Sequence, residues 1–139
     1  MRKTCTSFLL AALIGVAQVQ TPEMSKILTA ASKSLAETQF DDGNAVTVRG
    51  RVSTLVWPEG SSGMIVVEAS GEKFAFSSAK VREMAKQGFS RFTMKPGEEV
   101  VITGVRAKDN SKIGPGFTAA RADMVTKSDG HRIFDRSKL

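Results

Sequence analysis

Apolar and polar residues alternate from Val46 to Trp57, and this is the clearest pattern in the chain. The even-numbered positions are valine except for Gly50 and Thr54, and most odd-numbered positions are polar. A period of two predicts a long strand with one buried face. The glycine in the buried row predicts a point where the strand coils strongly enough to belong to both halves of a closed barrel.

Shorter segments after this strand predict the rest of one β-rich domain. The further strands are expected at Met64–Glu68, Glu72–Ser77, Glu99–Ala107 and Phe117–Thr126. A short helix should begin at Ser78 and end near Gly88, and a last extended piece should end at Phe134. Three strands, one helix and two strands is the order of an OB fold. We therefore predict a mainly β fold, a small five-stranded OB-like barrel over residues 44–139 with one short helix between strands three and four.

The first 17 residues predict a secretory signal peptide. Arg2 and Lys3 precede an apolar run from Phe8 to Ala17, which ends in small residues suited to cleavage. The run is well short of the roughly 20 residues that span a bilayer. We expect a periplasmic or secreted protein that keeps no transmembrane anchor after cleavage.

Residues 18–43 predict an amphipathic helix and a linker. Apolar residues recur at helical spacing within 22–40, and Pro22 suits the first turn. The aspartates, glycine and asparagine at 41–44 should end the helix and mark the domain boundary. Because an isolated helix of this length is marginal in water, it either docks on its own domain or pairs with another subunit.

Composition narrows the possible chemistry. The chain has a single cysteine, Cys5, and a single histidine, His131, which argues against a disulfide framework and a multi-histidine metal site. Residues 44–139 hold 16 basic and 10 acidic side chains, and this basic balance suits an anionic partner or simply solubility. We expect no metal and no cofactor.

The order of several short motifs resembles a family of small exported bacterial proteins of unknown function, with a signal peptide and one OB-like barrel. The residues that carry the resemblance are Val48, Gly50, Val52, Leu55, Trp57, Gly88, Phe89, Met94, Pro96, Gly97, Val100, Thr103, Gly104, Ala107, Lys108, Asp109, Ala119, Arg121, Asp129, Gly130, Ile133 and Phe134. Relatives typically show Asn-Pro-His after the tryptophan, whereas this chain has Pro58-Glu59-Gly60. The resemblance thus supports fold and export but implies no activity.

Candidate catalytic groups do not form a convincing set. His131 has Ser128 and Asp129 nearby, but a nucleophilic triad needs a rigid elbow and an oxyanion hole, and these residues lie in a polar turn. Glu98 and Glu99 are adjacent, so on a strand they point to opposite faces. We predict no catalytic residues and no enzymatic activity.

Trp57 is the most informative single residue for binding. On strict alternation it shares the outer face with Leu55, Arg49 and Arg51, unless a bulge near Gly50 changes the register. There it is either a binding anchor or a packing residue that closes one end of the barrel. The ligand-binding residues that we predict are Trp57, Arg49, Arg51, Arg106 and Lys108.

Two functions follow, and a third is weaker. The first is a non-catalytic periplasmic binding or accessory module for an anionic small molecule or an envelope protein, and the second is a structural envelope component acting through helix 22–40. The third, single-stranded nucleic-acid binding, needs outward-facing aromatic rings on strands two and three. A barrel this small needs Phe74 and Phe76 inside, so no nucleic acid is expected.

Overall fold

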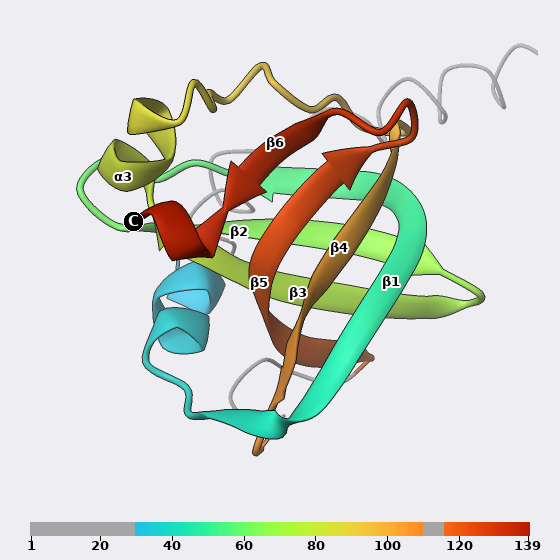
Figure 1. The fold of residues 1–139 in the computed structure, drawn as a ribbon. Coiled ribbons are helices and arrows are strands. Elements are labelled where there is room, and N and C mark those ends of the chain that lie inside the picture. The colour runs from blue at the N-terminus through green and yellow to red at the C-terminus, as the bar shows by residue number, and fades with distance from the viewer. Residues whose placement is uncertain (1–29, 110–115) are drawn as a thin grey trace, which may run out of the picture.

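A computed structural model describes residues 30–109 and 116–139, and strands form most of this part of the chain (Figure 1). Residues 30–36 are helical. The other elements are β1 (Phe40–Val56), β2 (Ser62–Ala69), β3 (Glu72–Lys80), α3 (Val81–Lys86), β4 (Glu99–Ala107), β5 (Phe117–Lys127), β6 (Arg132–Asp135) and the 3-10 helix η1 (Arg136–Lys138). The predicted signal peptide and the first part of helix 22–40 lie outside the described residues.

The prediction of a mainly β chain is confirmed, and its strand count is corrected. Six strands form one sheet instead of five, because the extended piece that ends near Phe134 pairs with β5 as β6. The helix between β3 and β4 begins at Val81 and not at Ser78, since β3 continues to Lys80 and pairs there with β2. No helix within the described residues is long and apolar enough to cross a membrane.

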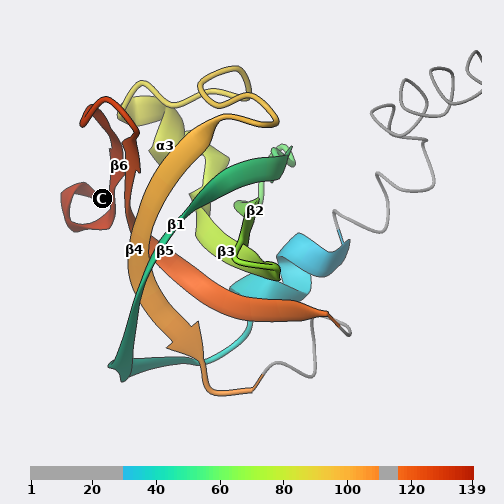
Figure 2. The same cartoon turned by 90° about the vertical axis from the view of Figure 1, so that its right-hand side faces the viewer.

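Five of the six strands form a hydrogen-bonded ring. The order in the sheet is β3-β2-β1-β4-β5-β6, and β3 also pairs with β5 in parallel, so each strand from β1 to β5 has two neighbours within the ring. The strands cross at steep angles around a common interior, and β6 lies beside β5 outside the ring (Figures 1 and 2). The remaining neighbours along the ring are antiparallel.

β1 is long enough to pair with β4 over its first half and with β2 over its second half. Arg51 lies where the two pairings meet, opposite Glu99 on one side and Glu68 on the other. The preceding Gly50 makes room for this crossing, because a Cβ there would lie 2.4 Å from the carbonyl oxygen of Glu68. The predicted bend at this glycine is therefore where β1 passes from one partner strand to the other.

A β-bulge in β1 changes which side chains face inward. The register with β2 shifts between Val52 and Thr54, so Ser53 is the extra residue. Before the bulge the even-numbered valines face the interior, whereas after it Leu55 and Trp57 pack against the inner core. Strict alternation placed Leu55 and Trp57 outside, and this is corrected: the bulge lies three residues beyond the position considered and reverses the faces.

The inner core lies within the ring of strands. The Phe74 and Phe76 side chains are 5% and 0% exposed and stack with ring centroids 5.9 Å apart, which confirms their predicted inward orientation. Valine, isoleucine and alanine side chains from every strand of the ring pack around them. The α3 helix adds Met84 at one end of this core.

A second, smaller core lies on the outer face of the ring, under the helical residues 30–36. Leu35 is fully buried there against apolar side chains of β1, β2, β3 and β5. The helix ends at residue 36 and not at 40, because Phe40 already begins β1 opposite Ala107. The predicted boundary at 41–44 is instead an irregularity in the β1–β4 pairing, between Phe40 and Ala45.

Candidate functional site

The structure distributes the five predicted ligand-binding residues over opposite ends of the molecule. Trp57 directly follows β1, whereas Arg106 and Lys108 lie at the end of β4, where β4 pairs with the start of β1. In Figure 1 these two places are the arrowhead of β1 and the arrowhead of β4, separated by the length of β1. One barrel end that unites Trp57 with these cations is therefore not present.

Trp57 and Arg106 each have a structural contact where they lie. Trp57 is half-buried and stacks on the buried Phe89, with ring centroids 5.7 Å apart and planes 10° apart. It therefore closes the packing at this end of the ring, as the second of the two readings expected. Arg106 lies over the inner Phe74 ring, with Cζ 5.8 Å from its centroid.

The remaining predicted cations are on the surface. The Arg49 guanidinium is 65% exposed and lies 3.3 Å from Glu99 across the β1–β4 pair. Arg51 donates through Nη1 to the Gly97 carbonyl at 3.0 Å, and the exposed Lys108 donates its backbone N–H to Gln39. These contacts extend or brace the strands and bring no groups together around a ligand.

The residues near His131 form an exposed turn. Asp129 accepts a hydrogen bond from the His131 backbone N–H at 2.8 Å through Oδ1. Its carboxylate therefore stabilises the turn through the backbone and not through the imidazole ring. No group of three or more metal-ligating side chains occurs within residues 30–109 and 116–139.

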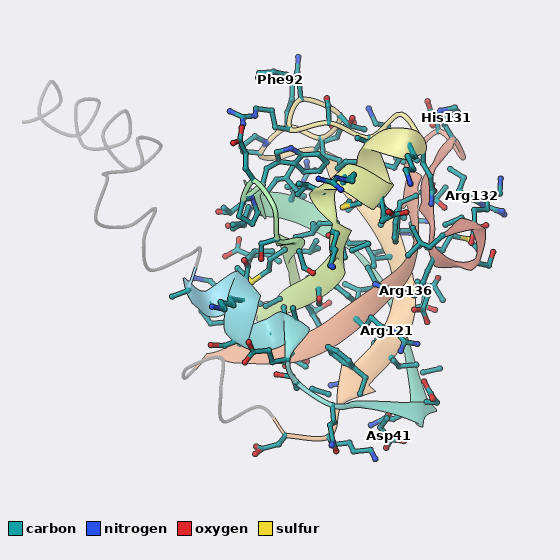
Figure 3. The ribbon with its side chains drawn as sticks, turned by 90° about the vertical axis from the view of Figure 1, so that its left-hand side faces the viewer. Asp41, Phe92, Arg121, His131, Arg132 and Arg136 are labelled. Carbon is teal, nitrogen blue, oxygen red and sulfur yellow. The ribbon has the colours of Figure 1, made fainter. Side chains whose placement is uncertain are left out.

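Two arginines that sequence reasoning did not select line a groove on the outer face. The groove has a volume of about 380 Å³ and lies between the end of the helical segment 30–36, the end of β3, β5 and the C-terminal segment. Its charged lining consists of Lys80, Arg121 and Arg136 against Glu83. We call it the two-arginine groove. Figure 3 shows Arg121 and Arg136 side by side on this face.

One carboxylate joins the two guanidinium groups. Asp123 Oδ1 lies 2.8 Å from Arg121 Nε and 3.1 Å from Arg136 Nε. Arg121 also reaches Asp42 at 3.4 Å, and its Cζ lies 5.9 Å from the centroid of the Phe40 ring. A single aspartate thereby fixes both cations, and Asp42 adds a second, exposed carboxylate beside Arg121.

Arg136 also ties the C-terminal segment to the sheet. Its Nε donates to the Ala122 carbonyl at 3.0 Å, and its Nη2 donates to the backbone carbonyls of Ser77 and Ser78. Burial lowers the pKa of Arg136, and the charge of Arg121 lowers it further. The hydrogen bond to Asp123 raises the pKa of Arg121. Both side chains remain cationic, because arginine titrates far above neutral pH.

Each guanidinium retains donors. Within the described residues, neither Arg121 Nη1 nor Arg136 Nη1 has a hydrogen-bond partner, which leaves a pair of N–H groups on each. Two arginines held at fixed positions with spare donors can bind a carboxylate, sulfate or phosphate through charge-assisted hydrogen bonds.

A second hollow, of about 590 Å³, lies between α3 and β6. The Gln87 side chain spans it and makes two hydrogen bonds of 2.9 Å with the backbone of Asp135, so it acts like one more strand residue beside β6. Its walls carry both cations and carboxylates, and Arg132 pairs with Asp135 at 3.3 Å. This mixture favours no single sign of ligand charge.

Comparison with known proteins places the chain in a family. The sequence profile of a family of unknown function, DUF6152, matches residues 24–116, which is about two thirds of the chain. The chain belongs to this family. This DUF6152 match agrees with the resemblance to a family of unknown function, while bacterial origin and export stay predictions. No curated protein matches the chain.

The family match ends before both groove arginines. It covers the helical segment and β1 to β4, whereas Arg121 lies on β5 and Arg136 in η1. Arg121 and Asp123 are two residues apart and therefore on one face of a strand, which is a signal that the sequence offered. Arg136 gave no comparable signal, because its partners are 14 and 58 residues away in the chain.

Proposed function

We propose that this member of the DUF6152 family is a non-catalytic binding module that holds a small anion in the two-arginine groove. The observation that carries the proposal is the pair Arg121 and Arg136, fixed by one carboxylate, with N–H donors on both guanidinium groups that no described residue accepts. Fixed donors lose little freedom when a ligand binds, which favours affinity for a planar or tetrahedral anion.

We further propose that the ring of strands is an OB-like barrel that works outside the cytoplasm. The parallel β3–β5 pair that completes the ring supports the barrel, and so does the helix between β3 and β4. The charged start and short apolar run of the first 17 residues support export to the periplasm or the medium.

Two observations weigh against the alternatives. The face of β2 and β3 on which OB folds stack nucleic-acid bases is covered here by Leu35, with Met64, Val66 and Ala75 buried beneath it. The described part of helix 22–40 packs on its own sheet, so its buried side cannot also join another subunit. An envelope protein that binds this module would therefore have to contact a surface other than the buried side of this helix.

Calorimetric titration of the full chain with inorganic phosphate, sulfate and succinate at low ionic strength tests the proposal. Arg121→Gln should weaken binding of the preferred anion at least about tenfold, because it removes one charged donor set. Arg49→Gln is the matched control, since it removes an equally charged but exposed side chain and should change affinity less than about twofold. Circular dichroism establishes that both variants are folded.

Two results would refute the proposal. One is the absence of saturable binding for all three anions. The other is equal affinity in Arg121→Gln and the wild-type chain, which would reduce the two arginines to a clamp between β5 and the C-terminal segment.

A further inference from the structure

Phe92 is an exposed aromatic side chain that the groove does not use. Among the described residues, Phe92 and Leu139 are the large apolar side chains that lie exposed, and Phe92 is 78% accessible. It occupies the loop between α3 and β4, at the opposite end of the molecule from Asp41 (Figure 3). A single exposed apolar side chain is common on protein surfaces, so what Phe92 indicates depends on the residues around it.

The loop holds Phe92 outward on a fixed turn. The Thr93 hydroxyl accepts from the Ser90 backbone N–H at 2.7 Å, and the Thr93 N–H donates to the Ser90 carbonyl at 3.1 Å. The Phe92 N–H donates to the Ser90 hydroxyl at 3.2 Å. On either side, Phe89 and Met94 are buried in the core and fasten the turn to the ring. The exposure of Phe92 is therefore a property of a braced turn.

The loop around Phe92 is basic, although the Glu98 carboxylate borders it and accepts the Lys95 backbone N–H at 3.1 Å. Residues 89–97 contain no acidic side chain, and Arg91 and Lys95 on the same loop are exposed without an ion pair among the described residues. His131 and Arg132 line one shallow hollow together with Phe92. Nearby carboxylates are engaged, since Glu98 pairs with Lys127 at 3.1 Å.

We propose that this loop docks the protein on an anionic lipid bilayer, with Phe92 entering the interfacial region and Arg91 and Lys95 contacting the headgroups. A bilayer is favoured over a protein partner by the small apolar area of Phe92 and by the cations beside it. One exposed phenylalanine offers far less apolar area than the roughly 1,000 Å² that a stable protein interface needs. It suffices for weak peripheral attachment when cations beside it meet anionic headgroups.

Fluorescence quenching tests where residue 92 lies. The full-length Phe92→Trp variant is mixed with vesicles of phosphatidylglycerol carrying brominated acyl chains, which quench only tryptophans that enter the bilayer. Trp57 is present in every variant and serves as a constant background. Asn44→Trp is the matched control, because Asn44 is exposed and close to Asp41, at the end of the molecule away from Phe92.

We expect strong quenching for Phe92→Trp and none beyond the Trp57 background for Asn44→Trp. Adding Arg91→Gln and Lys95→Gln to the Phe92→Trp variant should lower its apparent affinity for these vesicles about tenfold. The pair Arg49→Gln and Lys73→Gln removes as many cations elsewhere and should leave it within about twofold. Vesicles of phosphatidylcholine should quench far less.

Every variant contains the N-terminal apolar run, so a difference in quenching between positions 92 and 44 reports on the loop and not on that run. Equal quenching at positions 92 and 44 would overturn the proposal, as would quenching at 92 that phosphatidylcholine reproduces. A lack of quenching at 92, combined with tight capture of an acidic protein by the loop, would assign the surface to a protein partner instead.

Discussion

Replacing Gly104 by alanine should destabilise the protein strongly, because the backbone of β5 leaves no room for a side chain at this residue of β4. A Cβ at position 104 would lie 1.8 Å from the carbonyl oxygen of Arg121 and 2.9 Å from its carbonyl carbon. Both are backbone atoms in the middle of a strand, so no flexible side chain can move aside. The strands would have to separate at the bulge between Thr103 and Gly104.

The cost can be estimated from overpacking in protein cores. Extra methylene groups cost about 1–3 kcal/mol when side chains can adjust, and a backbone clash belongs at the upper end of that range. We expect a loss of about 3 kcal/mol in the free energy of unfolding. For a domain of about 100 residues this lowers Tm by roughly 12–24 °C.

Urea unfolding followed by far-UV circular dichroism measures the effect. The matched control is Gly43→Ala, which adds the same methyl group where the nearest atom, Asp41 Oδ1, is 3.4 Å away. That substitution should change stability by less than about 0.5 kcal/mol. If both variants unfold at the same urea concentration as the wild-type chain, the close approach of β5 to β4 is not a constraint and the reasoning fails.

Three further substitutions test other parts of the fold. Leu35→Ala should lower the free energy of unfolding by about 2–5 kcal/mol and speed proteolysis of residues 30–39, because the fully buried Leu35 side chain holds the helical segment on the sheet. Unchanged cleavage would show that the segment does not depend on this contact. Trp57→Ala should cost about 3 kcal/mol through loss of the stack on Phe89, and a loss under about 0.5 kcal/mol in urea unfolding would contradict the packing role. Hydrogen bonds from the Ser137 hydroxyl and backbone N–H lower the pKa of Asp135 below its usual 3.8, so the stability that this carboxylate contributes is present above that value and is lost as pH falls through the lower folded-state pKa. Asp135→Asn should therefore narrow the difference in urea midpoint between about pH 7 and about pH 3, and equal acid sensitivity in both proteins would contradict this account.

The strands could be predicted from the sequence because burial on a pleated sheet imposes a period of two. The expected strand Glu99–Ala107 coincides with β4, and the expected inward pair Phe74 and Phe76 is buried. Gly50 predicted the point where the long strand coils, and β1 passes from one partner strand to the other there. These are local signals, and each depends on a few consecutive residues.

The candidate site could not be predicted in the same way. Trp57 and Arg106 suggested one binding surface because both lie near strand ends, but the sequence does not encode that these ends are separated by the full length of a coiled 17-residue strand. The clustering of Arg121 with Arg136 depends on how β6 returns beside β5. Such contacts are set by the closure of the sheet, and no short motif reports it.

The bulge at Ser53 links the inner core to the position of the groove. Because it reverses the faces of β1, Val56 points outward and lies under Leu35, where an unbroken alternation would have placed Leu55 on that face. The helical segment packs there on Val56, Met64 and Val66, and its last residue, Ala36, lines the two-arginine groove together with Thr38. The inserted residue in β1 thus helps to position the helical segment beside Arg121 and Arg136. The anion site that we propose depends on this position as much as on the charges of the two arginines.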